Sequence, residues 1–243
     1  MINLPFQQAI LPRFLVRSAA VASLILLSGC VQRFDDMSTT LNEAFFGAED
    51  ITQTSQQVLE LPYASTYMRI NDGQRIFMVL GYAEQNPDNN QLQLKWVSSD
   101  GGMIVTENGR VVKTLNLPYG NLIRREVDLA HSQQAKPWQA NLQWQSQYDW
   151  ETQNSDSNKG KHYGYLGDVT LTRMGSEEAI SAIWQQTLTI WQENIFFPQL
   201  DTTVQNQYWV NDSGQVMKSI QYLGPEMTRI EFEILKPFAE AAQ

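Results

Sequence analysis

Between Trp138 and Trp150, apolar or small side chains alternate strictly with polar ones. The even positions hold Trp, Ala, Leu, Trp, Ser, Tyr and Trp, whereas the odd positions hold only Gln, Asn or Asp. Because successive side chains of a β-strand point to opposite faces, this pattern predicts a strand with one face packed and the other in water. Its predicted partner is 162–173, across the polar loop 151–160.

Regular turn signals divide much of the remaining chain into short strands. Asn71-Asp72-Gly73 and Asn108-Gly109 both mark hairpin turns, because Asn, Asp and Gly tolerate a positive φ. The predicted strands around such turns are 66–70, 75–82, 92–96, 103–107, 110–117, 122–129, 203–210, 215–223 and 229–235. The prediction is a mainly β fold, an antiparallel meander forming an open barrel or sandwich of about a dozen strands, with a closed barrel as a further arrangement.

The stretch 175–197 gives two conflicting signals. Ser176 followed by two glutamates is typical of a helix start, and apolar residues from Ile180 to Trp191 fit one helical face. The segments 187–191 and 195–197 are instead rich in β-branched and aromatic residues. We predict a strand from about Thr187, and 177–186 stays open between helix and strand.

The only cysteine, Cys30, ends an apolar run that reads Leu-Ser-Gly-Cys. Arg13 and Arg17 precede this run, so 1–29 has the basic and apolar regions of a secretory signal rather than the length of a spanning helix. The motif is similar to the lipobox of bacterial lipoproteins, which implies cleavage before Cys30 and lipidation of its thiol. Val31 in place of aspartate resembles the pattern sorted to the outer membrane. The alternative is a free, buried cysteine.

These signals divide the chain into three parts: a signal peptide (1–29, removed), a lipidated tether with one helix (30–63) and a single antiparallel β domain (64–243). The helix is predicted from Phe34, Met37, Leu41 and Phe45, which recur at helical spacing. Its polar face is acidic and lacks lysine, so packing against the protein body is favoured over lying on a membrane.

The charge of the mature chain argues against two kinds of partner. Residues 1–29 carry two arginines and no acids, so the remaining 214 residues hold 26 acidic and 15 basic side chains, a net charge of −11. This balance argues against nucleic acid and against an electrostatic attachment to anionic lipid headgroups.

The sequence shows no motif of a known catalytic or cofactor site. His131 and His162 lack the spacing of a zinc site, and no G-x-S-x-G, P-loop or dinucleotide-binding fingerprint occurs. We therefore predict no metal, no cofactor and no enzymatic activity. A pair of carboxylates brought together from distant strands leaves no sequence trace, so a hydrolase remains an alternative.

Aromatic residues of the predicted 138–173 hairpin are the candidate ligand-binding side chains. Trp138, Trp144 and Trp150 fall on one strand face and would form a stacking platform for sugars, and Tyr163 and Tyr165 are a polar aromatic pair on the partner. The favoured alternative is a row of core aromatics, with Trp144 in the core.

Several segments together resemble the YjbF/GfcB family. They are 61–70 (LPYASTYMRI), 108–114 (NGRVVKT) with 117–120 (LPYG), 208–210 (YWV), 221–225 (QYLGP) and 233–237 (EILKP). The resemblance runs from the lipobox almost to the end of the chain. It implies a lipoprotein encoded with exopolysaccharide or group 4 capsule genes, anchored in the outer membrane through Cys30 and facing the periplasm.

The resemblance also implies a role. The expected function is that of a non-catalytic accessory factor in polysaccharide secretion or assembly, with an outer-membrane barrel protein and a periplasmic export protein as partners. The alternatives are a module that binds polysaccharide or lipid, and a polysaccharide-modifying hydrolase.

Overall fold

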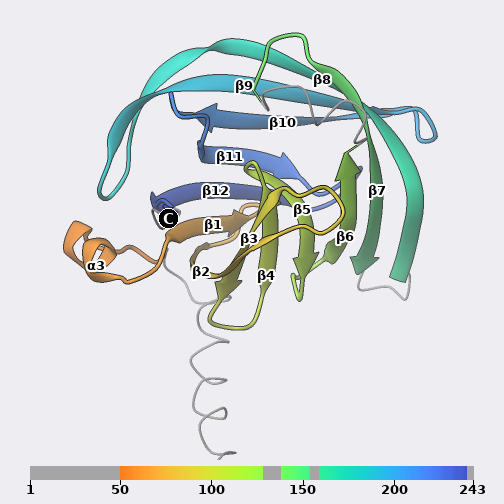
Figure 1. The fold of residues 1–243 in the computed structure, drawn as a ribbon. Coiled ribbons are helices and arrows are strands. Elements are labelled where there is room, and N and C mark those ends of the chain that lie inside the picture. The colour runs from red at the N-terminus through yellow and green to blue at the C-terminus, as the bar shows by residue number, and fades with distance from the viewer. Residues whose placement is uncertain (1–49, 128–137, 154–158, 240–243) are drawn as a thin grey trace, which may run out of the picture. The chain divides into compact units, whose positions relative to one another are not determined.

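The computed structural model describes residues 50–127, 138–153 and 159–239. In this part of the chain, twelve antiparallel strands form a single sheet in the order β5-β4-β3-β2-β1-β12-β11-β10-β9-β8-β7-β6 (Figure 1). The strands are β1 (Ser65–Ile70), β2 (Arg75–Gln85), β3 (Leu92–Ser98), β4 (Met103–Glu107), β5 (Arg110–Leu115), β6 (Gly120–Val127), β7 (Gln143–Gln153), β8 (Lys159–Ile180), β9 (Gln185–Phe197), β10 (Thr202–Val210), β11 (Val216–Tyr222) and β12 (Arg229–Lys236).

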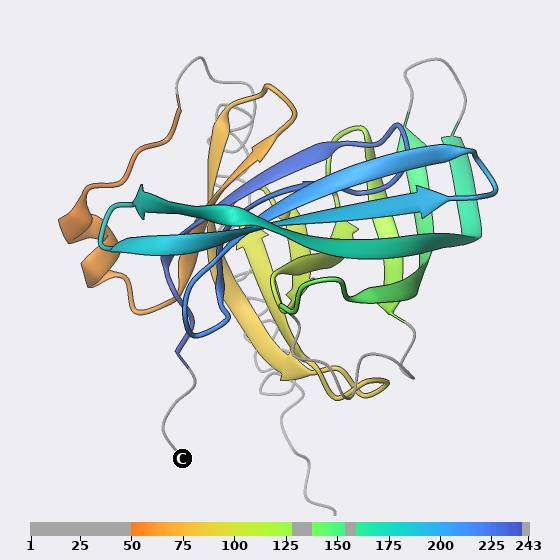
Figure 2. The same cartoon turned by 90° about the horizontal axis from the view of Figure 1, so that it is seen from above.

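The sheet curls until its two outermost strands, β5 and β6, lie side by side, which makes a nearly closed barrel. Figure 2, a view from above, shows the long β8 and β9 strands passing over the wall that β3 to β6 form. Side chains join the seam: the Leu122 amide donates to Thr114 Oγ1 at 2.9 Å, and the Leu117 amide donates to Asn121 Oδ1 at 3.1 Å. The predicted antiparallel β fold of about a dozen strands is confirmed.

The two ends of the β domain meet in the middle of the sheet. Every neighbouring pair in the sheet is also consecutive in sequence except β1 and β12, which pair antiparallel with Met68 opposite Phe232 and Ser65 opposite Lys236. The fold is thus two meanders, β1 to β5 and β6 to β12, joined through the first and last strands.

The stretch that sequence left open, 177–186, is mostly strand. Ser176 pairs with Thr189 and Glu177 with Leu188, so β8 continues to Ile180. A tight turn follows, closed by a hydrogen bond from the Ser181 amide to the Trp184 carbonyl at 2.9 Å, and β9 begins two residues before the predicted Thr187. Pairing with the β-branched residues of β9 outweighs the local helical pattern.

The strand predicted from Trp138 begins only at Gln143. Asn141 has a φ of +61°, which interrupts the extended backbone. The segment nevertheless stays beside β8, since the Asn141 amide donates to the Leu171 carbonyl and the Leu171 amide to the Leu142 carbonyl, both at 3.0 Å. The predicted pairing of this strand with the segment after the polar loop is confirmed, in β7 and β8.

From residue 50 onward, where the description of the chain begins, the short helix α3 (Ser55–Glu60) precedes the sheet. A capping box starts it: Thr54 Oγ1 accepts from the Gln57 amide at 3.2 Å, and Gln57 Oε1 accepts from the Thr54 amide at 2.8 Å. The helix packs Val58 against Tyr67 and Leu235. This helix was not predicted from the sequence, and the one predicted around 34–45 lies outside the described residues.

Candidate functional site

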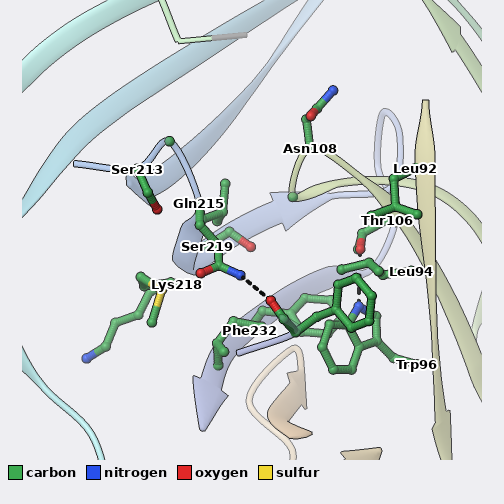
Figure 3. A pocket seen from close by; sticks show the side chains of 16 residues that line it. Leu92, Leu94, Trp96, Thr106, Asn108, Ser213, Gln215, Lys218, Ser219 and Phe232 are labelled. Atoms are coloured by element: carbon green, nitrogen blue, oxygen red, sulfur yellow. Dashed lines mark hydrogen bonds between the residues drawn. The ribbon is translucent and has the colours of Figure 1, made fainter. Parts of the chain in front are cut away.

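A cavity of about 410 Å³ lies inside the curved sheet, between β3 and β4 on one side and β11 and β12 on the other (Figure 3). This volume is within the range of about 300–1,000 Å³ typical of small-molecule sites. Its apolar lining comprises Leu92, Leu94, Trp96, Val216, Met217, Phe232, Ile234 and Phe238. Its polar lining comprises Thr106, Asn108, Ser213, Gln215, Lys218 and Ser219.

The turn between β4 and β5 forms one wall of the cavity. Asn108 and Gly109 both have positive φ, +48° and +77°, as the predicted tight hairpin turn requires. Gly109 also lies against β11 so closely that a Cβ there would be 2.2 Å from Val216 Cγ2. Only glycine fits both conditions, so this residue allows the hairpin to cross the interior and reach β11.

Gln221 of β11 fixes the hairpin in that position. Its Oε1 accepts a hydrogen bond from the Val111 amide, and its Nε2 donates to the Gly109 carbonyl, both at 2.9 Å. One buried amide therefore satisfies two backbone groups of the hairpin that the sheet ladder leaves unpaired.

Next to the hairpin, a buried ion cluster joins three strands that are distant in sequence. Glu193 of β9 is completely buried, with its Oε2 2.6 Å from Arg110 Nε of β5 and its Oε1 2.9 Å from Arg125 Nη2 of β6. Tyr208 and Asn206 of β10 donate to the same Oε1 at 3.1 and 3.2 Å. Four donors thus surround one carboxylate.

These contacts fix the ionisation of Glu193. Burial by itself would raise the pKa of this carboxyl, but the charges and hydrogen bonds of Arg125 and Arg110 outweigh burial and lower its pKa to about 2. Burial raises the pKa of Tyr208 and Tyr148 above the ordinary value. A carboxylate ionised at neutral pH and enclosed by two arginines does not serve as a proton donor, so its arrangement is that of a structural brace.

The cluster contains two arginines and one glutamate, so it has a net positive charge. Aromatic rings surround the guanidinium group of Arg110. The Arg110 guanidinium carbon lies 4.4 Å from the ring centroid of Trp138, 5.2 Å from that of Trp144 and 5.4 Å from that of Tyr208. Arg110 Nη2 has no hydrogen-bond partner among the described residues. The ring quadrupoles partly replace the water that the guanidinium has lost.

The structure places the three predicted tryptophans toward the interior, in different surroundings. Trp138 and Trp144 are half-buried and pack against the cluster of Leu171, Trp191 and Tyr208, whereas Trp150 is buried in the main core. They do not gather around one ligand site in the described structure, and none lines the cavity of Figure 3.

The two tyrosines of the predicted set differ from each other. Tyr165 is half-buried with its ring centroid 4.7 Å from that of Trp150, and Tyr163 is 58% exposed. His162 stacks on Trp150 at 4.8 Å. Neither tyrosine lines the cavity, and Cys30 lies outside the described residues.

The cavity itself carries little acid–base chemistry. Among the described residues that line it, there is no Asp or Glu, so a pair of glycosidase carboxylates is not assembled there. Within the same described ranges, no three side chains of His, Cys, Asp or Glu are grouped so that they could hold a metal ion.

In the part of the chain that the structure describes, no helix combines the length and the apolar character needed to cross a bilayer.

Together these features define a meander β-barrel domain with an interior cavity. The model of the family described as "Group 4 capsule polysaccharide lipoprotein gfcB, YjbF" matches residues 38–235, and the chain belongs to this family. The uncharacterized lipoprotein GfcB of Escherichia coli (strain K12) is 32% identical over 221 residues, which cover 88% of this chain and 94% of that protein.

Two further similarities agree with this family. The uncharacterized lipoprotein YjbF of the same strain is 29% identical over 229 residues, covering 90% of this chain and 97% of YjbF. The crystal structure of the hypothetical lipoprotein YmcC from Escherichia coli (K12) shares 32% identity and a TM-score of 0.64, covering 76% of this chain and 90% of YmcC. The family resemblance read from the sequence is confirmed, and membership of a lipoprotein family supports a membrane-anchored location.

Proposed function

We propose that this protein is an outer-membrane-anchored periplasmic lipoprotein that acts as a non-catalytic accessory factor in the secretion or assembly of exopolysaccharide or capsule. The observation that carries the proposal is the match of 38–235 to the group 4 capsule polysaccharide lipoprotein family. The sequence around Cys30 supplies the lipidation site that such an anchor requires.

The arrangement of the barrel supports a role without catalysis. Its most deeply buried acid, Glu193, is held by Arg110 and Arg125, and the described lining of the cavity contains no carboxylate.

The accessory role then operates through contacts with an outer-membrane barrel protein and a periplasmic export protein. A pull-down of the detergent-solubilised lipoprotein from cells that make the polymer tests these partners.

Deletion of the gene, followed by complementation, tests the function. Deletion should reduce surface polysaccharide, and the wild-type chain should restore it. Cys30→Ser should leave an unprocessed precursor that fails to restore the polymer. Ser28→Ala is the matched control, because it keeps a small residue before the cysteine and should be processed and restore export. Unchanged surface polysaccharide after deletion would refute the proposal.

A second experiment separates the accessory role from a hydrolase. Each Asp and Glu is replaced in turn by its amide, and every variant that folds and reaches the membrane should restore export. If one amide variant remains folded and anchored but abolishes export, a catalytic role replaces the accessory one.

The cavity supports the binding of polysaccharide or lipid as a second candidate function. Its volume suits a small ligand, and it is lined by strands that are far apart in the sequence.

A further inference from the structure

We infer that the cavity between β3, β4, β11 and β12 binds an uncharged segment of a glycan. This inference rests on the proposed function, because the glycan would come from the polysaccharide that the protein helps to secrete. The volume of about 410 Å³ is near the lower end of small-molecule sites, which suits about one or two sugar rings rather than a long stretch of polymer.

The charge of the cavity selects the ligand class. The whole chain has a net charge of −9, yet the described lining contains no Asp or Glu. Its single charged residue, Lys218, also lines a groove that contains Arg69 and Glu231, and its side chain points away from the other labelled side chains in Figure 3. A charged sugar placed in the cavity would lack a partner and would have to lose its water, so a neutral one is favoured.

The cavity has both apolar and polar surfaces, which complement the apolar C–H faces and the polar hydroxyl groups of a sugar ring. Leu94, Ile234 and Phe238 are half-buried and can cover the C–H face of a ring. Thr106 and Ser219 provide hydroxyl groups beside them. An acyl chain would cover these hydroxyls without pairing them, which is costly for buried polar groups.

Both hydroxyls have a hydrogen to donate. Thr106 Oγ1 accepts from Trp96 Nε1 at 3.1 Å, and Ser219 Oγ accepts from Gln221 Nε2 at 2.9 Å. A hydroxyl that accepts one hydrogen bond still has its own O–H group, and no acceptor within the cavity is assigned to either one in the described structure. A sugar hydroxyl entering the cavity could accept from each of them.

At the rim, Asn108 Nδ2 donates to Gln91 Oε1 at 2.9 Å and Gln215 Nε2 donates to the Phe238 carbonyl at 3.5 Å. Among the described residues no donor is assigned to the two amide oxygens, which can accept from a sugar hydroxyl. Asn108 is part of the hairpin wall, and the contact of Arg110 with Glu193 holds that wall in place. Arg110 is therefore a positioning residue for the site rather than a group that touches the ligand.

Calorimetric titration of the detergent-solubilised, full-length lipoprotein tests the inference. The probe is the neutral disaccharide fraction released by partial hydrolysis of the cell's own surface polysaccharide, with an acidic fraction and palmitate titrated separately. The neutral fraction should bind, and the acidic fraction and palmitate should bind at least about tenfold more weakly.

Two pairs of variants localise the binding. Leu94→Trp should fill the cavity and weaken binding at least about tenfold, whereas Leu115→Trp, at an exposed position of β5 outside the cavity, should not. Asn108→Gly should weaken binding by removing a rim amide, whereas Asn116→Gly is its control, since both asparagines have a positive φ that glycine adopts.

Each outcome decides the inference. Palmitate binding that Leu94→Trp abolishes, without sugar binding, would replace the glycan by a lipid. Absence of binding by the wild type, or sugar binding that neither cavity variant affects, would overturn the site. If deletion of the gene reduces surface polysaccharide but the wild-type protein does not bind the neutral fraction, only this inference fails and the accessory role stands.

Discussion

Arg110 Nε and Glu193 Oε2 lie 2.6 Å apart in the interior of the barrel, although 83 residues separate them in the sequence. The contact joins β5, at one margin of the sheet, to β9, the fourth strand from the other margin. The contact therefore fixes the β4–β5 hairpin against the opposite part of the sheet. The hydrogen bonds between β4 and β5 cannot do this, because they join only the two strands of the hairpin.

The Glu193→Gln variant should be strongly destabilised. The amide leaves the guanidinium groups of Arg110 and Arg125 buried without a counter-charge, and breaking a buried ion pair in this way typically costs about 3–5 kcal/mol. Urea unfolding measures the loss. The control is Glu84→Gln, which removes a half-exposed partner of Lys95 and should cost less than about 1 kcal/mol. Equal losses in both variants would contradict the structural importance of the cluster.

The free energy of unfolding should decrease in acid, over the pH range in which Glu193 becomes protonated. Because the pKa of Glu193 is about 2 in the folded protein against an ordinary value of 4.5, the folded state releases this proton more readily than the unfolded state. The resulting stabilisation is present above pH 4.5 and is lost as the pH falls from 4.5 toward 2. Thermal midpoints measured across this range should decline less steeply in Glu193→Gln. An identical slope in the variant would assign the acid sensitivity to other carboxyls.

Two glycine variants should separate backbone strain from steric contact. Gly101 and Gly109 have similar φ values, +81° and +77°, but an added Cβ would meet nothing within 4 Å at Gly101 and would lie 2.2 Å from Val216 at Gly109. Gly101→Ala should cost only the left-handed strain of about 1–2 kcal/mol. Gly109→Ala should cost more, because overpacking adds about 1–3 kcal/mol. Equal melting temperatures of the Gly101→Ala and Gly109→Ala variants would show that the hairpin is not in tight steric contact with β11.

Truncation of Trp150 should affect stability rather than surface recognition. The side chain is 2% exposed and packs against His162 and Tyr165, so Trp150→Ala should cost about 3–5 kcal/mol in denaturant unfolding. Tyr163→Ala, at a 58% exposed position of β8, should cost less than about 0.5 kcal/mol. A stable Trp150→Ala protein with impaired oligosaccharide binding would restore the stacking-platform hypothesis.

The hairpins of this fold were predictable because their signals are local. Asn71 and Asn108 adopt positive φ in the structure, as the Asn-Asp-Gly and Asn-Gly turns predict. The alternation around Tyr148 likewise predicted the face that is buried in β7. Local sequence cannot show where a strand begins when the polar–apolar pattern extends into the preceding turn, so the pattern places Trp138 in the strand although β7 begins at Gln143.

The cavity and the ion cluster were not predictable in the same way. Arg110, Arg125 and Glu193 come from three strands, and each looks in the sequence like an ordinary surface charge on an alternating strand. Only the curl of the sheet turns these positions inward. The helix α3 did leave a signal, because Thr54 and Gln57 have the spacing of a capping box.

The pairing of β1 with β12 has a consequence for the order of folding. Within each meander every strand pairs with its neighbour in the sequence, whereas the central ladder joins Met68 of β1 to Phe232 of β12, at opposite ends of the β domain. Closing so long a loop is slow, so the two meanders should form before the ladder that unites them. Completion of the domain is therefore expected to wait for this central ladder.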